Sequence, residues 1–185
     1  MIQNDYQRKV ILFIAMSLDG YIADENGGID WLCGQDQTAE NPDTYAAFIQ
    51  NIDAIVMGWK TYNQIITELS PQKWMYKGLT SYVVSHRLQP STDEIKFTDR
   101  QPEELIRYLK KQNSDKNIWI CGGAKIVSQL LCSDLIDEFY ISVIPTILGK
   151  GIRLFYSEHQ KIDLELIKSN NYNGIVELIY KRRKH

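Results

Sequence analysis

Two short segments place glycine and a basic residue directly after an apolar run. They are Val56-Met57-Gly58-Trp59-Lys60-Thr61 and Ile120-Cys121-Gly122-Gly123-Ala124-Lys125. Each has the pattern of a buried strand that ends at glycine and passes at once into a helix. The free N–H groups at a helix N-terminus can hold phosphate, and glycine lets a ligand approach the backbone closely. Two such junctions on one sheet would suit the pyrophosphate of a dinucleotide, although either junction alone is more simply explained as a tight turn.

A third polar segment, Ser85-His86-Arg87, follows a strand-like run that ends at Val84. Ligands of an open α/β sheet usually bind outside the carboxyl ends of its strands, which is where this segment would lie. The guanidinium of Arg87 suits a phosphate monoester, such as the 2′-phosphate that distinguishes NADP from NAD. On these residues alone, a solvated polar loop is the simpler interpretation.

Carboxylates are frequent in a long segment rich in Gly, Asp and Asn that follows the first apolar run. Those within it or just beyond it are Asp19, Asp24, Glu25, Asp30 and Asp36. A carboxyl group beside the indole of Trp31 could keep its proton at neutral pH and act as a proton donor. Because Asp and Gly also form turns, we expect most of these acids to be structural. We expect Asp19 to hydrogen-bond the turn that leaves the first strand.

The chain alternates strand-like and helix-like segments, which predicts an α/β domain with a mainly parallel central sheet flanked by helices. Apolar runs predict strands over 10–17, 54–57, 81–85, 95–98, 117–121 and 138–144. Helical patterns cover 42–52, 60–69 and 102–112 and continue from Gly123 to about residue 131, with Asn41 as a possible N-cap of the first helix. Alternating segments over 164–168 and 175–181 flank a turn sequence and predict an antiparallel hairpin at the edge of the sheet.

The composition is that of one soluble domain with a core over about residues 10–182. The 185 residues carry 21 basic and 23 acidic side chains, a formal charge of −2, which gives no bulk attraction for nucleic acid or for an anionic membrane. No apolar run approaches the roughly 20 residues that span a bilayer, and residues 1–9 do not resemble a signal peptide. Three cysteines without CxxC spacing and three scattered histidines indicate neither disulfides nor a metal site, so we expect a cytoplasmic protein.

Five segments, taken in order, resemble those of the dihydrofolate reductase-like family. They are residues 15–23, 57–62, 84–87, 122–125 and 145–155. The last of them, a proline followed by Leu-Gly-Lys-Gly and Leu-Phe, is typical of the branch named for the reductase domain of bacterial riboflavin biosynthesis, the RibD C-terminal domain. The resemblance covers nearly the whole chain, from about residue 10 to residue 182.

The resemblance implies that NADPH binds across the strand ends. It implies that the backbone at Ala15 and Ile22 holds the nicotinamide carboxamide. The other implied cofactor residues are Gly58, Lys60 and Thr61 at the pyrophosphate, Ser85, His86 and Arg87 at the 2′-phosphate, and Gly122, Gly123, Ala124, Lys125 and Ile126 at the second glycine junction. In the family a cis peptide joins the two glycines of that junction. Trp59 stands where the folate reductases usually have Arg, which places more of an NADP preference on Arg87 and Lys60.

These observations lead to one hypothesis and one alternative. The hypothesis is an NADPH-dependent reductase that transfers a hydride to a small polar heterocycle, such as a pteridine, a flavin or a riboflavin precursor like a 5-amino-6-ribosylaminouracil phosphate. Asp36, the nearest match to the pterin-binding acid of folate enzymes, Asp30 or an ordered water would deliver the proton, and the loop 18–31 would act as a lid. The alternative is a non-catalytic NADP-binding module. The resemblance also implies a homodimer.

Overall fold

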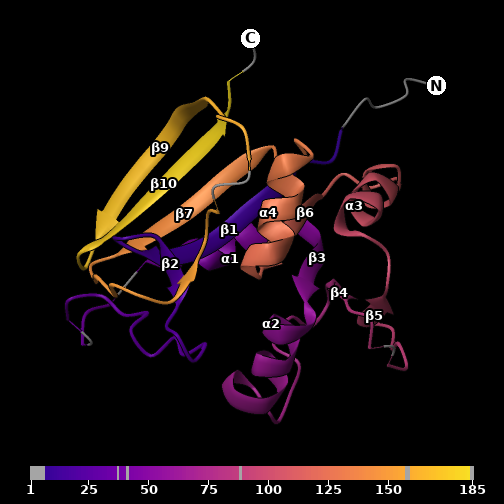
Figure 1. Ribbon diagram of the computed structural model, residues 1–185, viewed down its shortest axis with the longest axis horizontal. Coiled ribbons are helices and arrows are strands. Elements are labelled where there is room, and N and C mark those ends of the chain that lie inside the picture. Colours follow the sequence, from indigo (N-terminus) through magenta and orange to yellow (C-terminus); the bar gives the residue numbers. More distant parts are fainter. Residues whose placement is uncertain (1–6, 37, 41, 88, 157–158, 184–185) are drawn as a thin grey trace.

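The computed structural model describes residues 7–36, 38–40, 42–87, 89–156 and 159–183. Within these residues, eight strands form one sheet in the order β5-β4-β3-β6-β1-β7-β10-β9 (Figure 1). The strands from β5 to β7 in this order are parallel, and β10 and β9 are antiparallel to their neighbours. Their bounds are β1 Val10–Ser17, β3 Ile52–Gly58, β4 Thr80–Val84, β5 Ile95–Thr98, β6 Asn117–Gly122, β7 Glu138–Ile144, β9 Leu164–Tyr172 and β10 Ile175–Arg182. The predicted fold class is confirmed.

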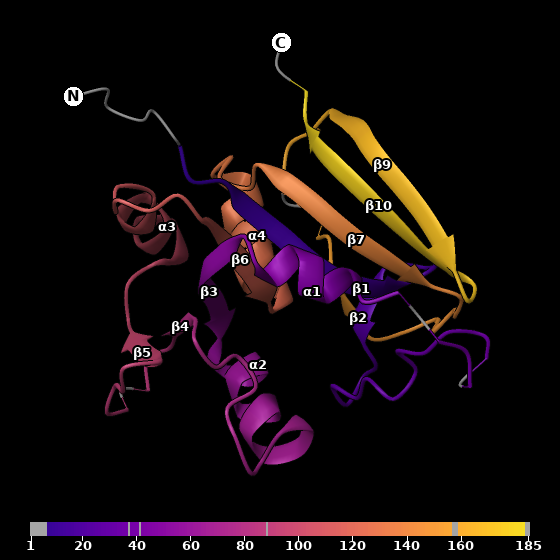
Figure 2. The ribbon, with the colours of Figure 1, turned by 180° about the vertical axis from the view of Figure 1, so that it is seen from behind.

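Helices cover both faces of the sheet (Figures 1 and 2). One face carries α1 (Thr44–Ile49), α2 (Trp59–Gln64) and the π-helix η1 (Ile65–Leu69), and the other carries α3 (Pro102–Lys110) and α4 (Ala124–Cys132). The chain first adds strands in the direction from β1 to β5, and the helices of these connections are α1, α2 and η1. It then adds strands in the direction from β5 to β7, and the helices of these connections are α3 and α4. Because crossovers between parallel strands are right-handed, a reversal of stepping direction moves the helices to the opposite face.

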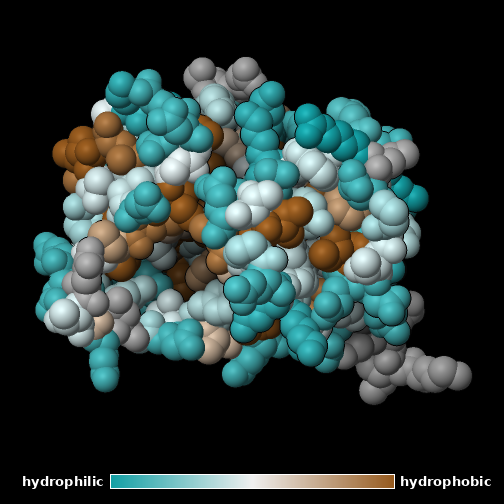
Figure 3. All heavy atoms as spheres, turned by 90° about the horizontal axis from the view of Figure 1, so that it is seen from below, coloured by the Kyte–Doolittle hydropathy of each residue, from teal (hydrophilic) through white to brown (hydrophobic). Residues whose placement is uncertain are grey.

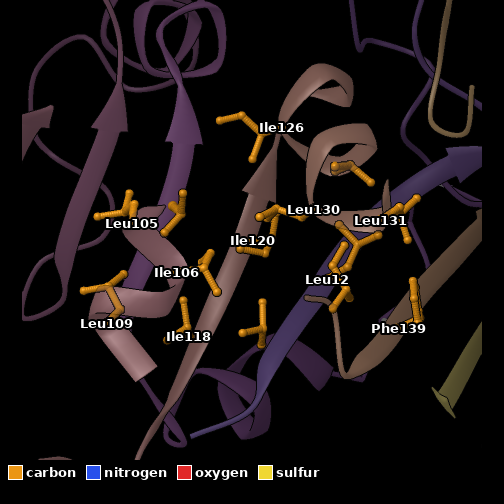
Figure 4. Close-up of a cluster of buried hydrophobic side chains, with 14 of the residues drawn as sticks. Leu12, Leu105, Ile106, Leu109, Ile118, Ile120, Ile126, Leu130, Leu131 and Phe139 are labelled. Atoms are coloured by element: carbon orange, nitrogen blue, oxygen red, sulfur yellow. The ribbon is translucent and has the colours of Figure 1, made fainter. Parts of the chain in front are cut away.

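The main hydrophobic core lies between the sheet and the helices α3 and α4 (Figure 4). Leu105, Ile106 and Leu109 form the buried side of α3 near Ile118 of β6. Leu12 of β1 lies near Leu131 of α4. On the opposite face, aromatic rings fill the space beneath α1. Phe48 of α1 stacks on Phe13 of β1 with ring centroids 4.3 Å apart, and Trp119 donates a hydrogen bond of 3.0 Å from its indole to the Phe13 carbonyl. Both faces of β1 and β6 are therefore buried, as their continuous apolar runs predict.

The first helix and the first loop differ from their predictions. The helix begins at Thr44, not at Pro42, because the Asp43 carboxylate caps it by accepting a hydrogen bond of 2.8 Å from the Ala46 N–H. Asn41, the predicted cap, lies outside the described residues. The loop after β1 contains a short strand, β2 (Tyr21–Ala23), which pairs with β8 (Ile152–Arg153) in a separate antiparallel sheet.

The predicted C-terminal hairpin is confirmed, and it is longer than the sequence indicates. β10 pairs with β7, and β9 forms the edge of the sheet. The strands are joined at Asn173-Gly174, where φ is +48° and +76°. Asn-Gly is the preferred pair for a hairpin turn that needs two positive φ angles. Among the described residues, no helix is long and apolar enough to cross a membrane.

Candidate functional site

The carboxyl ends of the parallel strands lie together at one end of the sheet, beside α2, and we call this end the carboxyl edge. The surface seen from this side contains a deep hollow with apolar atoms inside it (Figure 3). The register sets Met57 of β3 opposite Gly122 of β6, and Gly58 opposite Val84 of β4. The two glycine junctions and the Ser85-His86-Arg87 segment therefore leave three adjacent strands at the same edge.

The two glycine junctions are in direct proximity. A Cβ atom built on Gly123 would lie 3.4 Å from the hydroxyl oxygen of Thr61, and one built on Gly122 would lie 3.8 Å from the same atom. A Cβ on Gly58 would lie 3.9 Å from the Gly123 nitrogen. The Gly122-Gly123 peptide is cis, as the resemblance implies. Gly58, Thr61, Gly122 and Gly123 thus form one continuous cluster of backbone and hydroxyl groups, which we call the glycine patch; Gly122 is buried and the other three residues are half-buried.

The N-termini of two helices and two exposed lysines lie at the glycine patch. The N-cap residues are Gly58 for α2 and Gly123 for α4, and neither helix has a side-chain cap for its first N–H groups. Lys60 and Lys125 are exposed in the first turns of these helices. In the described part of the chain, no carboxylate pairs with Lys60 or Lys125. This edge therefore has hydrogen-bond donors and positive charge without an internal anion.

Arg87 joins the third polar segment to the first glycine junction. Its guanidinium lies 5.4 Å from the ring centroid of Trp59, the first residue of α2. The buried Ser85 fixes the turn, because its hydroxyl accepts a hydrogen bond of 2.8 Å from the Arg87 N–H. His86 is exposed beside it. Trp59, which replaces a phosphate-binding arginine of folate reductases in the resemblance, thus contacts a neighbouring arginine.

Asp19 ties the β1–β2 turn to the loop that follows β7. Its carboxylate accepts hydrogen bonds from the Ser17 hydroxyl at 2.7 Å, from the Leu148 N–H at 3.1 Å and from the Gly149 N–H at 2.7 Å. The Ser17 bond is the largest of the influences that lower the pKa of Asp19. The prediction that Asp19 supports this turn is confirmed. These bonds also fix the turn between Ala15 on β1 and Ile22 on β2.

The proposed lid is held by its own hydrogen bonds and by α2. The Asp24 carboxylate accepts bonds from the Asn26 and Gly28 N–H groups at 2.7 and 2.8 Å. The side-chain amide of Gln64 on α2 donates to the Gly27 carbonyl at 2.9 Å, and the Trp31 indole donates to the Gly28 carbonyl at 3.2 Å. The loop therefore contacts the helix that begins at the glycine patch.

The two acids predicted as proton donors are both exposed. Asp36 accepts hydrogen bonds from the N–H and the hydroxyl of Thr38, at 2.8 and 2.7 Å, and these bonds lower its pKa. Its backbone N–H and carbonyl are bound by the side chain of Asn173 in the hairpin turn. A solvated carboxyl group with a lowered pKa is a poor proton donor near neutral pH. The catalytic role of Asp30 or Asp36 stays a prediction.

Comparison with known proteins identifies the family. Residues 8–176 match the family described as the RibD C-terminal domain. This chain belongs to the RibD C-terminal domain family. It is 37% identical to the uncharacterized protein YwjB of Bacillus subtilis over 95% of this chain and 99% of that protein.

Two solved structures have the same fold as this chain. A Shewanella protein named for riboflavin biosynthesis has a TM-score of 0.82 and 28% identity, covering 95% of this chain and 99% of that one. Dihydrofolate reductase from Enterococcus faecalis, solved with NADP(H), has a TM-score of 0.67 and 14% identity, covering 97% of this chain and 99% of that one. The latter similarity shows the fold alone. This chain therefore shares its fold with both of these proteins.

One buried acid of this RibD-type domain escapes the sequence prediction. Glu177 of β10 is only 8% exposed, and it lines a cavity of about 360 Å³ between α1 and the strands β7, β10 and β9. Ile175 and Ile179 flank Glu177 at positions that face the same side of the sheet. The alternation of β10 therefore carries a signal that was available in the sequence: a charged residue at an inward-facing position.

Proposed function

We propose that this protein is an NADPH-dependent reductase that transfers a hydride to a small polar heterocycle, such as a pteridine, a flavin or a riboflavin precursor. The observation that carries the proposal is the glycine patch. It joins the uncapped starts of α2 and α4 into one surface of N–H donors, with the Thr61 hydroxyl between them. A pyrophosphate needs donors and positive charge of this kind.

The residues at this edge fit a phosphorylated dinucleotide chemically. Among the residues that the structure describes, no carboxylate pairs with Lys60, Lys125 or Arg87. A side chain on Gly123 would crowd Thr61, and Gly122 has a φ of +134°, which side-chain-bearing residues rarely adopt. Glycine at these positions keeps the backbone open to a ligand. Arg87 and Ser85 would face the 2′-phosphate, and the N-terminal turns of α2 and α4 would face the pyrophosphate.

The chain's own groups would bind the cofactor, orient it and exclude water. NADPH supplies the hydride, and the protein supplies binding and geometry. The backbone at Ala15 and Ile22 would hold the carboxamide and so orient the nicotinamide ring. The turn that Asp19 fixes keeps these two strands in place. The loop that contacts α2 through Gln64 would cover the reacting groups and keep water out.

A non-catalytic NADP-binding module is the second candidate, because Asp30 and Asp36 are both exposed and neither lies in a closed site. Consumption of NADPH, measured with a panel of pteridines, flavins and ribosylaminouracil phosphates, separates the two. Turnover with one of these compounds supports the reductase. Tight NADPH binding without turnover on any of them supports the module.

A pair of threonine variants tests the glycine patch. Thr61→Val removes the hydroxyl between the junctions and should weaken NADPH binding about 10- to 100-fold, the effect of one hydrogen bond to a charged group. Thr67→Val is the matched control, because Thr67 lies exposed in η1 and its hydroxyl donates to the Asn63 carbonyl of the preceding helix α2, away from the glycine junctions. Equal NADPH affinity of the two variants would contradict the proposed pyrophosphate site.

A further inference from the structure

Glu177 lies in the same cross-strand row as Ala15, the residue whose backbone would hold the nicotinamide carboxamide. Ala15 of β1 is directly opposite Ser142 of β7, and Ser142 is directly opposite Glu177 of β10. Residues directly opposite each other on neighbouring strands point to the same face of a sheet, and strands lie about 4.8 Å apart. The three residues therefore form a row that runs from Ala15, which would hold the nicotinamide carboxamide, to the buried carboxylate, on the face that α1 partly covers.

The carboxylate of Glu177 is held by two hydroxyl groups. One oxygen, Oε1, accepts hydrogen bonds from Thr44 Oγ1 at 2.6 Å and from the Tyr172 hydroxyl at 2.9 Å. Burial is the main cause that raises the pKa of Tyr172, so its hydroxyl stays protonated and keeps donating. These contacts come from α1 and β9, on either side of the cavity. They fix the direction of the carboxylate without neutralising its charge.

The other oxygen of Glu177 has no partner in the part of the chain that the structure describes. Oε2 accepts no hydrogen bond there, no cation pairs with the carboxylate, and the atom is not sealed off by protein. Glu138 provides a contrast within the same cavity, because it pairs with Lys9 Nζ at 2.6 Å and accepts from the Tyr140 hydroxyl at 3.3 Å. A buried charge without a counterion is costly.

We propose that Glu177 anchors the substrate by accepting hydrogen bonds from the N–H edge of a nitrogen heterocycle bound in the cavity. This inference rests on the proposed reductase function and narrows its substrate class to rings with adjacent ring N–H and amino donors. The cavity of about 360 Å³ is large enough for such a ring. Phe13 and Phe48 provide an apolar wall, and Ser142, which also lines the cavity, lies between Ala15 and Glu177 in the sheet.

Calorimetric titration with two small probes tests this site, with and without NADPH. Isocytosine carries a ring N–H beside an amino group, whereas 1,3-dimethyluracil has a similar ring and no N–H donor. The wild-type protein should bind isocytosine and not 1,3-dimethyluracil. Glu177→Gln keeps the shape of the side chain and an oxygen for Thr44 and Tyr172, and it should weaken isocytosine binding about 10- to 100-fold. Glu138→Gln is the matched control and should change the affinity less than about twofold, because the carboxylate of Glu138 is already paired.

The outcomes separate this inference from the proposed function. Failure of the wild-type protein to bind isocytosine, equal binding of both probes, or equal losses in the two variants would overturn the role of Glu177. NADPH affinity should be the same in wild type and Glu177→Gln. If the wild-type protein binds NADPH but fails these tests, only the proposed role of Glu177 is rejected. If the protein binds isocytosine through Glu177 but does not bind NADPH, the reductase proposal is rejected and the role of Glu177 in ligand binding is supported. If Glu177→Gln does not fold, a crystal structure of the wild type with isocytosine decides, by showing its N–H edge on Glu177 or elsewhere.

Discussion

Replacement of Arg87 by alanine should reduce the preference for NADPH over NADH. The guanidinium is exposed, and its contact with Trp59 holds it beside the start of α2. A hydrogen bond to a charged group contributes about 1.5–3 kcal/mol, and an exposed position favours the lower end of that range. A loss of about 1.5 kcal/mol corresponds to roughly tenfold weaker NADPH binding. NADH has no 2′-phosphate, so its affinity should change less than about twofold.

The assay is a fluorescence titration of each variant with NADPH and with NADH at fixed ionic strength. Arg107→Ala is the control, because Arg107 is an exposed arginine in the last turn of α3, at the opposite edge of the sheet. The control should bind both cofactors as the wild type does. Equal losses for NADPH and NADH in Arg87→Ala would refute the 2′-phosphate role. An equal loss of NADPH affinity in Arg107→Ala would show that only the overall charge matters.

Three further predictions concern stability and assembly. Asp19→Asn should lower the free energy of unfolding at neutral pH. The Ser17 hydroxyl and backbone N–H groups lower the pKa of Asp19, so the stabilising effect of its carboxylate is complete above about pH 4 and is lost as the pH falls through the lowered pKa. The unfolding free energies of the wild type and Asp19→Asn should therefore converge in acid. Urea unfolding across this pH range tests the prediction, and a difference that stays constant contradicts it. Gly151→Ala would push a Cβ into the β2 backbone and should cost about 1–3 kcal/mol in urea unfolding, more than Gly149→Ala, where the space is open; equal costs would contradict the β2–β8 contact. We expect a homodimer, and Leu166→Glu on the edge strand β9, where Leu166 is 50% exposed, should give a monomer in sedimentation velocity, whereas a monomeric wild type would refute this expectation.

Much of the fold could be predicted because its strands carry local signals. β1, β5 and β7 have the predicted bounds, since each is an apolar or β-branched run, and β7 is ended by Pro145. The start of α1 could not be predicted, because Asn41 and Asp43 are both good cap residues and only the chain geometry selects Asp43. The strands β2 and β8 are two or three residues long and exist through pairing between distant segments, which periodicity does not show.

The candidate site was predictable in part for the same reason. The glycine junctions are local patterns, and the parallel register brings Gly58 and Gly122 together as the alternation of strands and helices implies. Glu177 was missed because the site that holds its carboxylate includes Thr44, which lies 133 residues away in the chain. Its signal was a charged residue at an inward position of a strand. That signal indicates a buried acid, but not which cavity the acid faces.

The binding of NADPH at the glycine patch is the central claim, and amide chemical shifts measured during a titration test it most directly. Saturating NADPH should shift the backbone amides of Gly58–Thr61 and Gly122–Ile126 together, with one affinity, and NADH should shift them at higher concentrations. Shifts confined to another surface, or no shift at either junction, would contradict the account.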